Sequence, residues 1–134
     1  MQNRWQILIT KNDNMKTSIN KLIRKGHCTV NIPILTIYFL SYKIFDMSFI
    51  VLGISTLIAW GFWSFSIPKW KLNSLRNLNS TAEYFDWNSK AIWNGLNWPE
   101  HSFINKTEIW NKKDKAEYEK LKNNLLNLNA DSGN

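Results

Sequence analysis

The sequence is poor in the residues that build cross-links and metal sites. Its 134 residues include one cysteine, Cys28, and two histidines, His27 and His101. A lone cysteine excludes an intrachain disulfide and a zinc site made of several cysteines. His101 follows Glu100 without the spacing that sets two imidazoles on one helix face. We therefore expect no metal and no cofactor, and we interpret both histidines as surface or interfacial residues.

Glycine is also scarce, and its five copies are scattered along the chain. This distribution excludes a Gly-rich phosphate loop. One pair of carboxylates, Glu83 and Asp86, shares a face near the start of a predicted helix, where acids usually interact with the helix dipole. The sequence thus predicts no catalytic residues, and we expect that the protein is not an enzyme.

The most informative absence is that of charge between Asp46 and Lys69. The segment Met47–Ile67 reads MSFIVLGISTLIAWGFWSFSI and is almost entirely apolar or small. A helix rises about 1.5 Å per residue, so about twenty such residues cross a hydrocarbon core about 30 Å thick. We therefore predict a single transmembrane helix over residues 47–67, with the lipid bilayer as its main partner.

Aromatic and cationic residues gather at the carboxyl end of this segment. Such residues are typical of the level where a membrane helix meets the headgroups. Cations near this end favour a C-terminal tail on the cytoplasmic or matrix side, although Arg24 and Lys25 weaken that orientation if the N-terminus is present. The Lys- and Asn-rich composition is typical of an AT-rich genome and favours a bacterial or organellar inner membrane. The predicted membrane anchors are Trp60, Trp63, Lys69, Trp70 and Lys71.

Small residues recur inside the predicted span. Gly53 and Gly61 are eight residues apart, and Ser55 and Ala59 are four apart. Small residues at such spacings allow helices to approach closely. They predict lateral packing against another membrane helix; the alternative is that small residues are simply tolerated in lipid.

The N-terminal region 1–46 is polar and basic, with a net charge of +5. We found no sustained apolar period in its first part, and we interpret the region as disordered, interfacial or absent from the native protein, since Met47 can serve as a start codon. Residues 28–45 contain the apolar stretch VNIPILTIYFLSY, which is short for a spanning helix. The sequence leaves open whether this stretch enters the membrane.

The tail, residues 68–134, reads as two helices joined by irregular segments. Pro68 is expected to stop or kink the membrane helix. Ser80 and Glu83 form a predicted capping box that opens a helix near 81–94, and Gly95 suits its end. A second, amphipathic helix is predicted near 112–129.

Tryptophan is abundant, with eight copies, several of them in this short tail. Tryptophan side chains are frequent at protein–protein hot spots, and here they fit three uses: a compact core, contact with the membrane surface, or docking of a partner. The predicted partner surface comprises Trp87, Trp93, Trp98, Trp110, Tyr118, Leu121, Leu125 and Leu128.

Together these features predict a mainly α protein: a single transmembrane helix followed by a short, Trp-rich helical tail. The function expected is that of a non-enzymatic accessory or assembly component of a membrane complex, in contact with another membrane protein or with itself. The alternative is a membrane-tethered binding module whose tail captures a small ligand or glycan. Basic and acidic residues alternate in the tail, so nucleic acid is not an expected partner. The identity of the complex, its pathway and the oligomeric state stay open.

Overall fold

The computed structural model describes residues 4–45 and 48–127, with side chains from residue 13 onward. The described residues form helices and connecting segments without strands, which confirms the mainly α prediction. The elements in chain order are α1 (Arg4–Gly26), η1 (His27–Asn31), α2 (Ile32–Ile44), α3 (Phe49–Leu75), α4 (Thr81–Trp93), η2 (Phe103–Thr107) and α5 (Lys112–Asn127).

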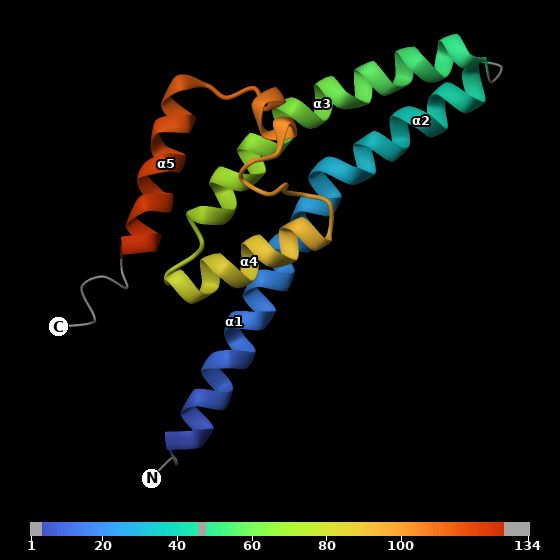
Figure 1. Cartoon of the computed structure of the whole chain (residues 1–134). Helices are drawn as coiled ribbons and strands as arrows, with labels where there is room; N and C mark the ends of the chain where they lie inside the picture. The colour runs from blue at the N-terminus through green and yellow to red at the C-terminus, as the bar shows by residue number, and fades with distance from the viewer. Residues whose placement is uncertain (1–3, 46–47, 128–134) are drawn as a thin grey trace.

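The dominant feature is a long helical hairpin. α1, η1 and α2 follow one another as a single leg, and α3 returns beside it, as Figure 1 shows. Pro33 has no backbone N–H for the carbonyl four residues before it, and the chain passes this point as the π-helical segment η1, where the Ile32 N–H donates to the His27 carbonyl. Ser48 caps α3 by accepting a hydrogen bond from the Val51 N–H at 3.3 Å.

The N-terminal leg is ordered rather than disordered. Ile19, Leu22 and Ile23 lie on one face of α1 and are buried in the main core. Their spacing of three and four residues is helical, and Met15 extends the same stripe. The sequence reading missed this stripe because polar residues surround it, and the interpretation of this region as disordered is wrong for its described part.

Pro68 neither stops α3 nor leaves a buried carbonyl unpaired. A proline in a helix cannot donate to the carbonyl four residues earlier, here that of Ser64. The Ile109 N–H, from the segment between η2 and α5, donates to the Ser64 oxygen at 2.9 Å instead. α3 therefore continues to Leu75, beyond the end at Ile67 that was predicted for the membrane helix.

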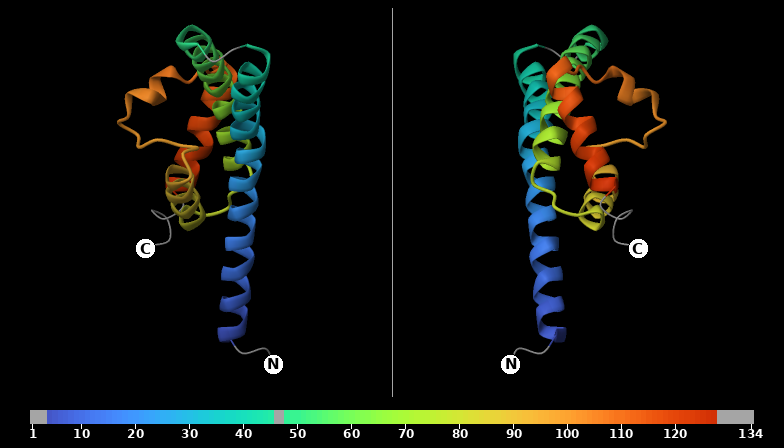
Figure 2. Two further views of the ribbon diagram at one scale, coloured as in Figure 1. Left: turned by 90° about the vertical axis from the view of Figure 1, so that its right-hand side faces the viewer. Right: turned by 90° about the vertical axis from the view of Figure 1, so that its left-hand side faces the viewer.

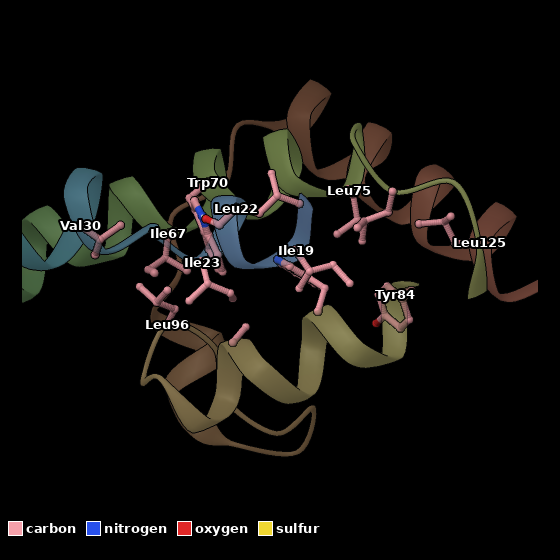
Figure 3. Close-up of a cluster of buried hydrophobic side chains, with 13 residues drawn as sticks. Ile19, Leu22, Ile23, Val30, Ile67, Trp70, Leu75, Tyr84, Leu96 and Leu125 are labelled. Atoms are coloured by element: carbon pink, nitrogen blue, oxygen red, sulfur yellow. The ribbon is translucent and has the colours of Figure 1, made fainter. Parts of the chain in front are cut away.

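The core lies at the base of the hairpin, where α4 and α5 cover its two legs (Figures 1 and 2). Trp87 of α4 is fully buried, and its ring lies 5.5 Å from that of Trp70 on α3. Figure 3 shows this cluster gathering side chains from both legs and from the tail. Its labelled members are Ile19, Leu22, Ile23, Val30, Ile67, Trp70, Leu75, Tyr84, Leu96 and Leu125.

The two tail helices follow the sequence prediction closely. Ser80 Oγ accepts a hydrogen bond from the Glu83 N–H at 3.2 Å, and the Glu83 carboxylate accepts one from the Asn79 N–H at 2.7 Å. Gly95 has a φ of 67°, as a residue after a helix end requires. The helices predicted near 81–94 and 112–129 appear as α4 and α5, the last two residues of the second lying outside the described residues.

Candidate functional site

The far half of the hairpin exposes large apolar side chains from both legs. Among the described helices, α3 is long and apolar enough to cross a membrane, and only 22% of its most apolar window is buried. α2 lies beside it and has no buried residue. The exposed large apolar side chains of this half are Ile32, Leu35, Phe39, Leu40, Tyr42, Ile44, Phe45, Phe49, Ile50, Leu52, Ile54, Leu57, Ile58, Trp60 and Phe65.

Hydroxyl groups join the two legs within this half. The Ser55 hydroxyl donates to Ser41 Oγ at 2.7 Å, and the Tyr38 hydroxyl donates to Thr56 Oγ1 at 3.1 Å. These pairs fix the antiparallel register of α2 against α3. Ser55 and Ala59 are buried, as expected for small residues between helices, but the helix they face belongs to the same chain.

Gly53 and Gly61 lie elsewhere on α3. A Cβ atom built on either glycine meets no other atom within 4 Å. These two positions therefore face away from α2, and their use in packing against a further helix stays a prediction.

The predicted membrane anchors divide into two groups. Trp60 and Lys69 are exposed, and Trp63 is half-buried beside Trp60, with ring centroids 6.1 Å apart. Trp70 and Lys71 are buried in the base. The prediction that these last two anchor the helix in the headgroups is wrong, because each has its partners inside the protein.

Trp70 closes the contact between the two legs. Its indole N–H donates to the Leu22 carbonyl of α1 at 3.0 Å. Opposite the ring lies Gly26, where an added Cβ would come within 2.7 Å of both Trp70 and Leu96. Only glycine leaves room for this ring at the end of α1.

Lys71 forms a buried ion pair with Glu108. Lys71 Nζ and Glu108 Oε1 are 2.5 Å apart, and both side chains are about 95% buried. The Trp110 indole N–H donates to the other carboxylate oxygen at 3.0 Å. A buried pair of this kind needs such additional hydrogen bonds to offset its desolvation.

The predicted partner surface is largely used inside the protein. Trp87 and Leu125 are buried, and Tyr118 and Leu121 pack against the core. The Trp110 ring lies tilted against that of Tyr118, with 4.8 Å between centroids. Of the predicted set, Trp93 and Trp98 are the exposed members that the structure describes, and Leu128 lies outside the described residues.

Trp93 is the more prominent of these two. It is 88% exposed at the end of α4, whereas Trp98 is 39% exposed. The end of α4 is tied to the N-terminal leg through His27, whose Nε2 donates to Asn94 Oδ1 and whose Nδ1 accepts from Asn31. The Trp93 side chain is therefore exposed to solvent on a helix end that hydrogen bonds fix to the first leg.

A polar cleft of about 470 Å³ lies between α4, α5 and the segment that joins them. Burial raises the pKa of Tyr84 and, more strongly, that of Tyr118. A hydrogen bond from Lys122 lowers the pKa of Glu100, so this carboxylate stays ionised. The cleft combines aromatic rings, amides and ion pairs, and its lining includes Trp98, Trp110, Asn88, Asn97, Asn105 and Lys71.

A second cleft, of about 270 Å³, opens between the two legs at the base of the hairpin. It is lined by Lys25 and Thr29 from the first leg and by Ser66, Lys69, Trp70 and Asn73 from α3. Sequence reading missed it because its residues are distant in sequence. The available signal was that Lys25 and Lys69 each border a charge-free stretch.

Among the described side chains, no group of three or more His, Cys, Asp or Glu residues is placed to hold a metal ion. No family model, curated protein or solved structure matches this chain.

Proposed function

We propose that this protein is a small membrane protein that acts as a non-enzymatic accessory or assembly component of a membrane complex. The observation that carries the proposal is the exposed apolar surface of the far half of the hairpin. Water-exposed patches of such extent are unusual on soluble monomers, and they mark surfaces for lipid or protein partners.

The geometry favours a hairpin in the bilayer rather than the single span expected from the sequence. α2 and α3 are held side by side by the pairs Tyr38–Thr56 and Ser41–Ser55. The uncovered part of α3, residues 49–65, is about 25 Å long at 1.5 Å per residue, which is near the lower limit for a span. Both legs therefore enter the membrane to the same depth.

Such a hairpin has both ends of the described chain on one side of the membrane. Arg24, Lys25 and Lys69 lie at the base, whereas Lys43 is the cation near the tip. The positive-inside rule then favours a base on the cytoplasmic or matrix side. This orientation agrees with that inferred for the tail alone, and it removes the conflict posed by Arg24 and Lys25.

Trp93 supports the accessory role. An exposed tryptophan on a fixed helix end supplies a large contact area at little entropic cost. The ion pairs of Lys71 with Glu108 and of Lys122 with Glu100 occupy charged groups of the polar cleft in structural contacts, which favours a non-enzymatic role.

Two measurements test this proposal. Carbonate extraction of native membranes should leave the protein in the pellet, and tags at the two ends should be accessible from the same side. Release by carbonate would contradict the membrane assignment, and tags on opposite sides would contradict the hairpin.

A pull-down from native membranes in mild detergent tests the accessory role. We expect stoichiometric recovery of one membrane assembly, lost in the variant Trp93→Ala. The matched control is Phe103→Ala, which removes another exposed aromatic side chain. Recovery of the protein alone would contradict the accessory role.

The polar cleft favours the second candidate, a membrane-tethered module that binds a small polar ligand or glycan. Its aromatic rings and amides are the groups that recognise such molecules. The core shared by α1, α3, α4 and α5 indicates that the tail would need the base of the hairpin to form this cleft. Binding of a ligand by the full chain, lost in Trp98→Ala, would support this candidate over the first.

A further inference from the structure

The cleft of about 270 Å³ between the two legs is lined by basic, polar and aromatic residues. Its lining contains two lysines, two hydroxyl residues, an asparagine and an indole ring, and no acidic residue. Lys25 and Lys69 are exposed, and the described side chains provide neither of them with an ion-pair partner.

Four other cations of the base pair with acidic side chains: Lys71 with Glu108, Arg76 with Glu117, Lys90 with Asp86 and Lys122 with Glu100. The cleft, in contrast, brings together two lysines from opposite legs without an acidic side chain in its lining. Its electrostatic potential attracts an anion.

The position of the cleft indicates which anion. It lies where the uncovered apolar surface of the two legs ends and the core of the base begins, because Ser66 and Lys69 follow within about one turn of Phe65. In a hairpin inserted as described above, this level coincides with the lipid headgroups. The lysine stems and the Trp70 ring add apolar lining, which suits a lipid better than a free ion.

We propose that this cleft binds the phosphate of an anionic lipid headgroup. Lys25 and Lys69 supply the positive charge from opposite legs, and Ser66 and Asn73 supply hydrogen-bond donors to the phosphate. The Thr29 hydroxyl donates to the Lys25 carbonyl and only lines the cleft. Bound lipid thus joins the two legs at the membrane surface. The inference rests on the membrane insertion proposed above and adds a defined headgroup site to it.

Native mass spectrometry of the full-length protein in mild detergent tests the site. The probes are phosphatidylglycerol, phosphatidylcholine and inorganic phosphate, each titrated separately. We expect one phosphatidylglycerol to bind in preference to phosphatidylcholine. Each lysine near an anionic lipid contributes a roughly fivefold gain, so Lys25→Gln/Lys69→Gln should weaken binding on the order of thirtyfold.

The matched control is Lys16→Gln/Lys120→Gln, which removes the same charge from exposed positions outside the cleft. This variant should bind phosphatidylglycerol like the wild type. Equal loss in both double variants would overturn the site, since it would reflect net charge alone. Equal affinity for both lipids would also overturn it, and displacement of the lipid by inorganic phosphate at similar concentrations would identify a free-phosphate site instead.

Carbonate extraction separates this inference from the proposed function. Both double variants should remain in the membrane pellet, because the apolar hairpin is unchanged. Resistance to extraction without lipid preference would contradict the headgroup site alone. Extraction of the wild type would contradict the membrane insertion on which the site rests.

Discussion

The two halves of the hairpin are built from similar apolar residues but bury them differently. In the base, α1 and α3 pack with α4 and α5 around Trp70 and Trp87. In the far half, α2 and α3 touch only along one face, where hydroxyl groups join them. The comparison shows that an apolar sequence alone does not specify a protein core, because the same helix α3 serves both environments.

Charge distinguishes the halves as well. The base contains many charged groups and neutralises some of them in pairs, including the buried pair of Lys71 and Glu108. The described far half carries one cation, Lys43, near its tip. A protein core can accommodate a paired charge, whereas a hydrocarbon environment disfavours even that.

The largest expected change is in the free energy of unfolding when a core side chain, rather than an exposed one, is truncated. Trp70→Ala removes a buried ring and its hydrogen bond to Leu22, and we expect a loss of about 3–5 kcal/mol in the free energy of unfolding. Leu57, 74% exposed on the same helix, is the control, and Leu57→Ala should change this free energy by about 0.5 kcal/mol or less. Denaturant unfolding in mild detergent measures both. Equal losses would contradict the division into halves.

The next prediction concerns the buried ion pair. Lys71→Met leaves the Glu108 carboxylate buried without its cation, which should cost about 3–5 kcal/mol. The double variant Lys71→Met/Glu108→Gln removes both charges and should recover most of this loss. Thermal unfolding followed by circular dichroism tests the pair, and a double variant as unstable as the single one would contradict the electrostatic explanation.

Two glycine-to-alanine substitutions are expected to change the free energy of unfolding in opposite directions. Gly26→Ala places a Cβ within 2.7 Å of Trp70 and Leu96, and overpacking of this kind costs about 1–3 kcal/mol. Gly53→Ala meets no neighbouring atom, and alanine stabilises a helix interior by about 1 kcal/mol relative to glycine. The unfolding free energies of the two variants should therefore move in opposite directions, and destabilisation by both would show that Gly53 is also packed.

The smallest expected effect is that of pH on the local stability of α5. Hydrogen bonds from Lys122 and Arg76 lower the pKa values of Glu100 and Glu117 below the ordinary 4.5. Their stabilisation is complete above this ordinary value and is lost as the pH falls through the lowered values in the folded protein. Both ion pairs join α5 to other segments of the protein. The protection factors of the α5 amides, which correct for the intrinsic pH dependence of exchange, should therefore fall in acid before those of the α3 amides. Arg76→Gln should reduce this pH dependence, and an unchanged acid response would exclude Glu117 as its source.

Much of the local structure was predictable from the sequence. The capping residues Ser80 and Glu83, the turn at Gly95 and the amphipathic face of α5 act within a few residues, so their patterns report helices directly. The expected stop at Pro68 and the anchoring roles of Trp70 and Lys71 failed for a common reason. Each depends on a partner far away in sequence: Ile109, Leu22 and Glu108.

The sequence by itself determined that the chain is helical and that one helix is long and apolar enough to cross a membrane, because hydropathy and periodicity are local properties. Only the tertiary structure decided which apolar residues are buried in the protein and which are left for another environment. It also decided which lysines are neutralised and which two flank a cleft between the legs. These outcomes depend on the packing of α1 against α3, which joins residues about fifty positions apart.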